Sequence, residues 1–106
     1  MVSEILTAAG IQERGSRFVK PPADTYAVWF DTVHADGADG EPPRIFTHDV
    51  TVELYAQKKD PAAERALEDA MGARGLKWTK HDRIWIQSEQ MYQTIYEFSY
   101  IEKRRT

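Results

Sequence analysis

The feature that most constrains this chain is a regular alternation of apolar and polar side chains over residues 47–57. Side chains of a strand point alternately to the two faces of its sheet, so this alternation predicts a strand with one buried face. A second alternating segment, residues 25–34, precedes it. Residues 35–44 between them contain the turn-rich run DGADGEPP, which predicts a long hairpin loop. The two alternating segments are therefore predicted to pair as a first hairpin.

A helix and a second hairpin are predicted in the remainder of the chain. Asp60 can cap free backbone N–H groups, and Pro61 lacks the donor that would go unpaired at the first helical position, so a helix is predicted over residues 60–73. Its apolar stripe should face the sheet. The charged residues expected on its solvent side are Glu64, Arg65, Glu68 and Asp69. Residues 76–86 predict one strand with a central bulge, and residues 91–101 predict the last strand.

The N-terminal segment completes the predicted domain. Ser3 can cap a short helix that ends at Gly10, and residues 12–24 are expected to be a connection because Gly and Pro interrupt every periodic pattern there. At 106 residues the chain fits one domain, residues 1–106. The expected fold is α+β: a four-stranded antiparallel sheet from two hairpins, with two helices on one face, in the order αββαββ.

Charge and composition restrict the classes of function. Residues 1–53 hold nine acidic and four basic side chains, whereas residues 54–106 hold eight acidic and ten basic ones. This split differs from the basic domain typical of a nucleic-acid-binding protein, and it would suit head-to-tail contact between identical copies. The chain has no Cys, which excludes disulfides and Cys-based zinc sites. Residues 1–10 lack the positive charge and long apolar run of a signal peptide, so we expect cytosolic synthesis.

Two helices on one side would leave the other face of the sheet uncovered. We expect Trp29, Tyr55 and Trp85 on this face, among Glu53, Arg83 and Gln93. Trp and Tyr are enriched at binding hot spots, so these aromatic residues are candidates for an interface. The alternative is that they are covered within the monomer, by Phe18, Phe46 or the C-terminal tail. The pattern alone favours neither.

Candidate chemical sites are weak in this sequence. His34, Asp36 and His48 could approach one another across the first hairpin and hold a metal ion, but their spacing matches no known metal motif. The loop carboxylates Asp36, Asp39 and Glu41 could hold calcium, although they lack the EF-hand order. A solvated acidic loop is the plainer interpretation. We therefore assign no metal site and no cofactor.

Motifs for covalent or nucleotide chemistry are missing from the sequence. No G-x-S-x-G turn, Cys nucleophile or phosphate-binding glycine loop occurs, so no catalytic residue is assigned. Because carboxylates are numerous, the sequence leaves open the possibility that two of them form a catalytic pair like that of a glycosidase. Two basic clusters, residues 58–59 and 103–105, could contact phosphates of nucleic acid, but charge runs of this kind are usually solvated.

Three segments resemble a known family. They are RFVKPPADTYAVWF (residues 17–30), VTVELYAQKKDPAAERALEDAM (residues 50–71) and WIQSEQMYQTIYEF (residues 85–98). They are similar to the small tail-completion or tail-terminator proteins, which join head and tail in long-tailed phages and prophages. The combination of ELY, KKDP and SEQMYQ is unusual, although each piece also has a plain folding explanation. The resemblance covers most of the chain from Arg17 onward.

The resemblance implies a structural virion protein without catalysis. Such proteins form a ring, usually hexameric, that caps the head-proximal end of the tail tube, stops its growth and offers a surface to the head connector. The implied partners are further copies of the chain, the tail tube protein and the connector protein, with DNA in the lumen as a further contact for the basic C-terminus. The implied location is the head–tail joint of the virion, and the host cytoplasm during assembly.

These observations give one leading hypothesis and two alternatives. The leading one is a tail terminator, with its interface at Trp29, Glu53, Tyr55 and Trp85 and at the loop residues Asp36, Asp39, Glu41 and Arg44. The first alternative is a head-closure protein on the other side of the same joint. The second is a small ligand- or metal-binding domain that uses His34, Asp36 and His48.

Overall fold

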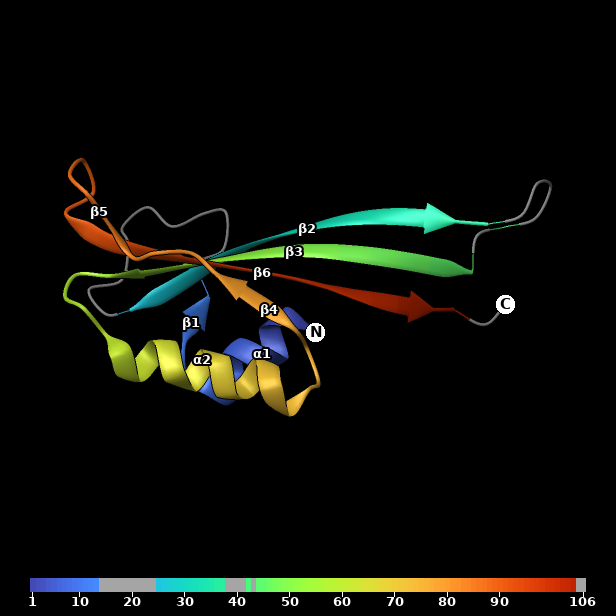
Figure 1. Cartoon of the computed structure of the whole chain (residues 1–106), viewed down its shortest axis with the longest axis horizontal. Coiled ribbons are helices and arrows are strands. Elements are labelled where there is room, and N and C mark those ends of the chain that lie inside the picture. Colours follow the sequence, from blue (N-terminus) through green and yellow to red (C-terminus); the bar gives the residue numbers. More distant parts are fainter. Residues whose placement is uncertain (14–24, 38–41, 43, 105–106) are drawn as a thin grey trace.

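The computed structural model describes residues 1–13, 25–37, 42 and 44–104. Within these residues lie two helices and a six-stranded mixed sheet (Figure 1). The elements are α1 Val2–Ala9, β1 Gln12–Glu13, β2 Tyr26–Asp36, β3 Ile45–Ala56, α2 Pro61–Ala73, β4 Trp78–Lys80, β5 Ile84–Ile86 and β6 Met91–Lys103. The strand order is β1-β2-β3-β6-β4, and β5 also pairs with β6.

The predicted four-stranded antiparallel sheet with the order αββαββ is wrong. The expected connection at residues 12–24 begins with β1, which pairs in parallel with β2 through Gln12 and Tyr26. The strand expected over residues 76–86 is two short strands, β4 and β5, which pair antiparallel with different parts of β6. Strands of two or three residues are too short to produce a readable alternation, so the sequence pattern could not separate them.

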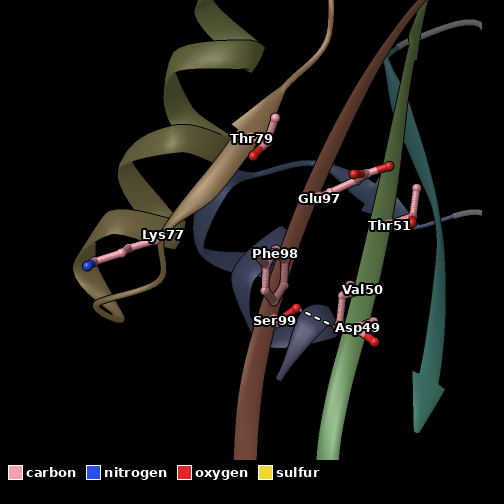
Figure 2. A pocket seen from close by; sticks show the side chains of 8 residues that line it. All are labelled: Asp49, Val50, Thr51, Lys77, Thr79, Glu97, Phe98 and Ser99. Atoms are coloured by element: carbon pink, nitrogen blue, oxygen red, sulfur yellow. Dashed lines mark hydrogen bonds between the residues drawn. The ribbon is translucent and has the colours of Figure 1, made fainter.

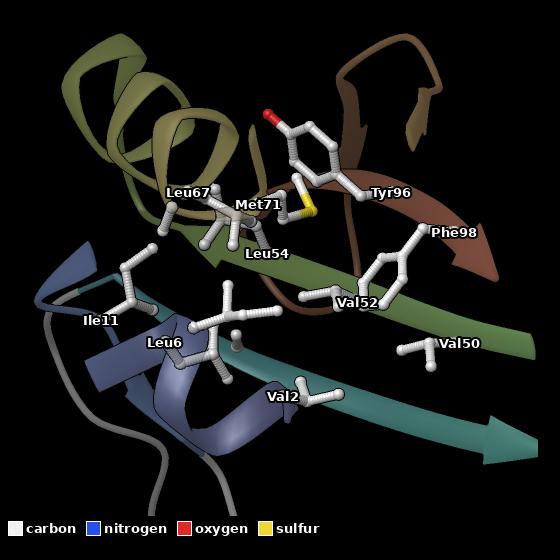
Figure 3. Packing of buried hydrophobic residues seen from close by; sticks show 13 residues of the cluster. Val2, Leu6, Ile11, Val50, Val52, Leu54, Leu67, Met71, Tyr96 and Phe98 are labelled. Atoms are coloured by element: carbon white, nitrogen blue, oxygen red, sulfur yellow. The ribbon is translucent and has the colours of Figure 1, made fainter. Parts of the chain in front are cut away.

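Both helices pack against one face of the sheet and enclose the core (Figures 1 and 3). Leu67 and Met71 of α2 are fully buried there, as is Leu6 of α1. The strands contribute Val50, Val52, Leu54, Tyr96 and Phe98. The apolar positions of β3 face the helices because its alternation sets one whole side of the strand against them.

Helix α2 begins where its capping residue predicts. The Asp60 carboxylate accepts a hydrogen bond from the backbone N–H of Ala63 at 3.1 Å and one from the Thr25 hydroxyl at 2.6 Å. The same side chain therefore satisfies a free helix donor and ties the helix start to the residue preceding β2.

Removing this cap should weaken the fold. We expect Asp60→Ala to lower the free energy of unfolding by about 1 kcal/mol, the usual effect of losing an N-cap. Urea denaturation measures this loss. Asp69→Ala, on the exposed side of the same helix, is the matched control and should change little. Equal losses in the two variants would contradict the capping role.

An ion network around the buried Glu64 joins α2 to residues 80 and 83, so the predicted solvent-side position of Glu64 is wrong. Glu64 is only 5% exposed. Its carboxylate accepts hydrogen bonds from Arg83 at 2.8 Å and Lys80 at 2.9 Å. Burial alone would raise the pKa of Glu64, but these two cations outweigh it and lower the pKa. Lys80 also binds Glu68 at 2.8 Å, and Glu68 accepts the Tyr96 hydroxyl at 2.6 Å.

Beyond the helices, β2, β3 and β6 continue together as a three-stranded extension (Figure 1). We call this extension the arm and define it as residues 32–36, 45–49 and 99–103. It makes the molecule elongated, with principal extents of 51 × 29 × 22 Å. Most of the arm lies beyond the helices (Figure 1), although Tyr100 at its base packs against the core.

Candidate interaction site

The arm has a free strand edge along each border. On one border, β1 pairs with only Tyr26 and Ala27 of β2, so residues 28–36 have no strand partner on that side within the described chain. On the other border, pairing of β4 with β6 ends at Phe98, so residues 99–103 are likewise unpaired among the described residues. A free edge presents backbone N–H and C=O groups that can pair with another chain.

The face of the sheet opposite the helices carries exposed apolar side chains at both borders. Residues directly paired across neighbouring strands share a face, which assigns the odd-numbered residues of β3 to this side, which we call the open face. Phe30 of β2 is 54% exposed and Ile101 of β6 is 63% exposed. Single exposed apolar residues are ordinary, but these two lie beside unpaired strand edges.

The middle of the open face is a polar groove of about 600 Å³ (Figure 2). Its lining residues are Asp49, Val50, Thr51, Lys77, Thr79, Glu97, Phe98 and Ser99. They come from β3, β6, β4 and the residue just before β4. The groove is open and mostly polar, so it resembles a hydrated surface more than the apolar cavity that holds a small ligand.

At one end of the groove, three hydrogen-bonded side chains include the residue types of a serine hydrolase. Ser99 Oγ donates to Asp49 Oδ1 at 2.6 Å, and His34 Nε2 lies 3.0 Å from Asp49 Oδ2. The Ser99 hydroxyl, and to a lesser extent His34, lower the pKa of Asp49. In a serine hydrolase the imidazole lies between hydroxyl and carboxylate, whereas here the carboxylate lies between the other two. This order does not activate Ser99 as a nucleophile.

On the helix-side face of the arm, His48 connects three strands. Its Nδ1 lies 2.8 Å from Asp31 Oδ2 of β2, and its Nε2 lies 2.8 Å from Glu102 Oε1 of β6. His48 is buried, and its imidazole stacks on Tyr100 with ring centroids 4.3 Å apart. The hydrogen bond to Asp31 contributes most to raising the pKa of His48 above its ordinary 6.5, and the bond to Glu102 contributes next. Burial acts in the opposite direction and lowers this pKa. The sequence analysis did not identify this cluster.

The expectation that Trp29, Tyr55 and Trp85 share the uncovered face is wrong for both tryptophans. Trp29 pairs with Val52, so it lies on the helix side, where it is half-buried and donates its indole N–H to Glu13 at 2.9 Å. Trp85 pairs with Tyr92, and Tyr92 pairs with Ala56, which is one of the β3 residues that face the helices. Trp85 therefore also lies on the helix side. Trp85 remains 43% exposed and makes an edge contact with Tyr92.

Glu53 and Tyr55 do lie on the open face. The Tyr55 hydroxyl donates to Glu53 at 2.9 Å and accepts from Gln93 at 2.8 Å, and its ring stacks on Tyr26. Burial, followed by the bond to Glu53, raises the pKa of Tyr55 to about 12. Tyr55 is thus half-buried and hydrogen-bonded within the chain, and an interface role for Glu53 and Tyr55 stays a prediction.

The predicted loop residues divide into two groups. Asp36 and Arg44 are exposed at the end of the arm, whereas Asp39, Glu41 and Phe18 lie outside the described residues. Phe46 does not cover the tyrosines or tryptophans, because its ring lies in the arm under the Arg104 guanidinium at 4.0 Å.

The three residues of the metal alternative do not converge. His34 pairs with Thr47 and lies on the open face with Asp36, whereas His48 pairs with Val33 and lies on the opposite face. Within the described part of the chain, no three His, Cys, Asp or Glu side chains are grouped closely enough to hold a metal ion.

No protein-family profile and no curated protein matches the chain. Neither helix in the described ranges is long and apolar enough to cross a bilayer. The arm and the sequence resemblance are therefore the features from which a function can be inferred.

Proposed function

We propose that the protein is a structural subunit of a phage tail: a terminator or completion protein that forms a ring on the head-proximal end of the tail tube, stops tube growth and joins the tube to the head connector. The observation that carries this proposal is a pair of strand edges on opposite borders of one arm, both unpaired among the residues that the structure describes. The sequence resemblance supplies the phage context. The proposed location is the head–tail joint, reached after assembly in the host cytoplasm.

The geometry of the two edges favours contact between different patches of identical copies. β2 and β6 are both antiparallel to β3, so they run in the same direction. A second copy in the same orientation would pair its β6 edge with the β2 edge of the first as parallel strands, with both open faces on one side. Such a contact is heterologous, because it joins two different patches of identical subunits. It gives a closed ring when the rotation from one copy to the next is a whole-number fraction of a full turn.

Charge also favours this arrangement. Asp36 on β2 and Lys103 on β6 both pair with Ile45, so they lie at the same level on opposite borders of the arm and on the same face. Side-by-side copies in that register would place Asp36 of one copy beside Lys103 of the next. Opposite charges across an interface favour one register and disfavour others.

Exchanging these two charges tests the contact. We expect Asp36→Lys alone and Lys103→Asp alone to weaken ring formation, since each brings like charges together. The double variant Asp36→Lys/Lys103→Asp should recover assembly because it restores the opposite pair. Native mass spectrometry of the protein with tail tubes, built from the tube protein of the same genome, measures the rings. A double variant no better than the two single variants would contradict this register.

The same measurement tests the function itself. We expect rings on the tubes and tubes of limited length, whether or not the free protein is monomeric. A protein that never binds or caps tubes would overturn the proposal. The head-closure alternative predicts binding to the purified connector without binding to the tube, so the two partners are tested separately.

A further inference from the structure

Asp31, His48 and Glu102 form a bridge whose geometry depends on the charge of His48. The ring proposal does not depend on this charge. Each ring nitrogen of His48 lies 2.8 Å from a carboxylate oxygen. A neutral imidazole has only one N–H and can donate to only one carboxylate. The second nitrogen would then direct its lone pair at an oxygen that also carries lone pairs. The observed geometry therefore suits the imidazolium form, which donates to both carboxylates.

The location of the bridge gives this charge a structural consequence. Asp31 belongs to β2 at the base of the arm, His48 to β3 and Glu102 to β6 near the arm's end, so one side chain links all three strands. The His48 side chain is 10% exposed, whereas those of Asp31 and Glu102 are 21% and 37% exposed. Asp31 Oδ1 is buried and has no hydrogen-bond partner among the described residues. The cation thus compensates a carboxylate that water reaches poorly.

Other charged and titratable groups around His48 come from β6, the residue after it, α1 and β3. On β6, Tyr100 stacks on the imidazole. After β6, Arg104 binds Glu102 at 3.1 Å. On α1, Glu4 acts electrostatically on Tyr100 and is itself paired with the N-terminal amine at 2.8 Å. Asp49 follows His48 on β3 but points to the open face, where it binds His34 and Ser99.

We propose that His48 is a proton-dependent latch that holds the three strands of the arm together when protonated and releases them when it loses its proton. The latch is a property of the arm and stands whether or not the protein forms rings. The folded arm retains the His48 proton more strongly than an opened arm does, because both carboxylates bind it. The latch therefore stabilises the arm fully below pH 6.5, and this stabilisation is lost as the pH rises through the higher pKa of the closed arm.

Hydrogen exchange of backbone amides measures the latch. In wild-type protein we expect the ratio of arm to core protection factors to fall between pH 6 and pH 9. The fall should be about tenfold for each unit by which the His48 pKa in the closed arm exceeds 6.5. Core amides near Val52 and Leu54 provide the internal reference, because intrinsic exchange changes equally for both groups.

Two matched variants separate the latch from general effects of pH. His48→Gln should give a ratio that no longer changes with pH. His34→Gln removes the histidine on the other face of the same arm and should retain the wild-type pH dependence. A wild-type pH dependence in His48→Gln, or its loss in His34→Gln, would overturn the latch.

Direct titration of wild-type protein keeps the test independent of how the variants fold. Nitrogen-15 NMR of the His48 ring should show both nitrogens protonated in acid, with a midpoint above pH 6.5. Asp31→Asn should lower the midpoint more than Glu102→Gln, because the bond to Asp31 contributes more to the raised pKa. A wild-type midpoint at or below 6.5 would refute the proposal.

Discussion

Ile101→Lys is expected to abolish the proposed ring assembly on tail tubes while leaving the subunit folded. Ile101 is 63% exposed, so its replacement loses little packing within one chain and should change stability by no more than about 0.5 kcal/mol. In the proposed contact the side chain lies beside a neighbouring β2 edge, at the level of that copy's His34, where a Lys would replace an apolar contact with a charge. The cost is repeated at every contact of a closed ring, so assembly should fail completely. Native mass spectrometry with tubes measures assembly, and circular dichroism checks the fold.

The matched control for this experiment is Ile84→Lys. Ile84 is 50% exposed and pairs with Gln93 on the open face, but it belongs to β5 and not to either arm edge. We expect its variant to assemble as wild type does. Normal assembly by Ile101→Lys would rule out the β6 edge as the contact. Failure of both variants would point to the open face as a whole.

The largest loss of stability is expected from Leu67→Ala. Leu67 is fully buried between α2 and the sheet (Figure 3). Removing its outer carbons leaves a cavity, and substitutions of this type lower the free energy of unfolding by about 2–5 kcal/mol. That is a large part of the 5–15 kcal/mol typical of a domain. Urea denaturation should show a lower midpoint.

Arg65→Ala is the control for Leu67→Ala. Arg65 lies on the exposed side of the same helix, so its variant should stay within about 0.5 kcal/mol of wild type. A loss below about 1 kcal/mol for Leu67→Ala would mean that α2 is not packed on the sheet as described.

The long elements of this fold could be predicted from the sequence, whereas the sheet could not. The alternation over residues 47–57 identifies β3, and Asp60 with Pro61 locates the start of α2. β1, β4 and β5 contain only two or three residues each, so no period is readable in them. Their pairing depends on long-range contacts that propensity does not encode.

The two tryptophan errors have a definite physical origin. Alternation shows that neighbouring residues of a strand face opposite ways, but it does not show which side of one strand joins which side of the next. That choice depends on the register, which pairs Trp29 with Val52 and Trp85 with Tyr92. A prediction that is one residue out exchanges the two faces completely.

Glu64 and His48 show a second limit of sequence analysis. A charged residue on a helix is usually solvated, and Glu64 is buried only because Arg83 and Lys80 reach it from residues 16 to 19 positions later. His48 binds Glu102, which lies 54 positions away. Knowing the hairpin register would have placed Asp31 and His48 on one face, but not their third partner.

The two open borders of the arm have a consequence for the subunit before assembly. A sheet that is unpaired on both sides contains no internal stop, because each added copy presents a fresh edge. Only the rotation between neighbours decides whether the chain of copies closes or continues as a fibre. A small change in the twist of the arm would therefore convert the proposed cap of fixed size into a filament.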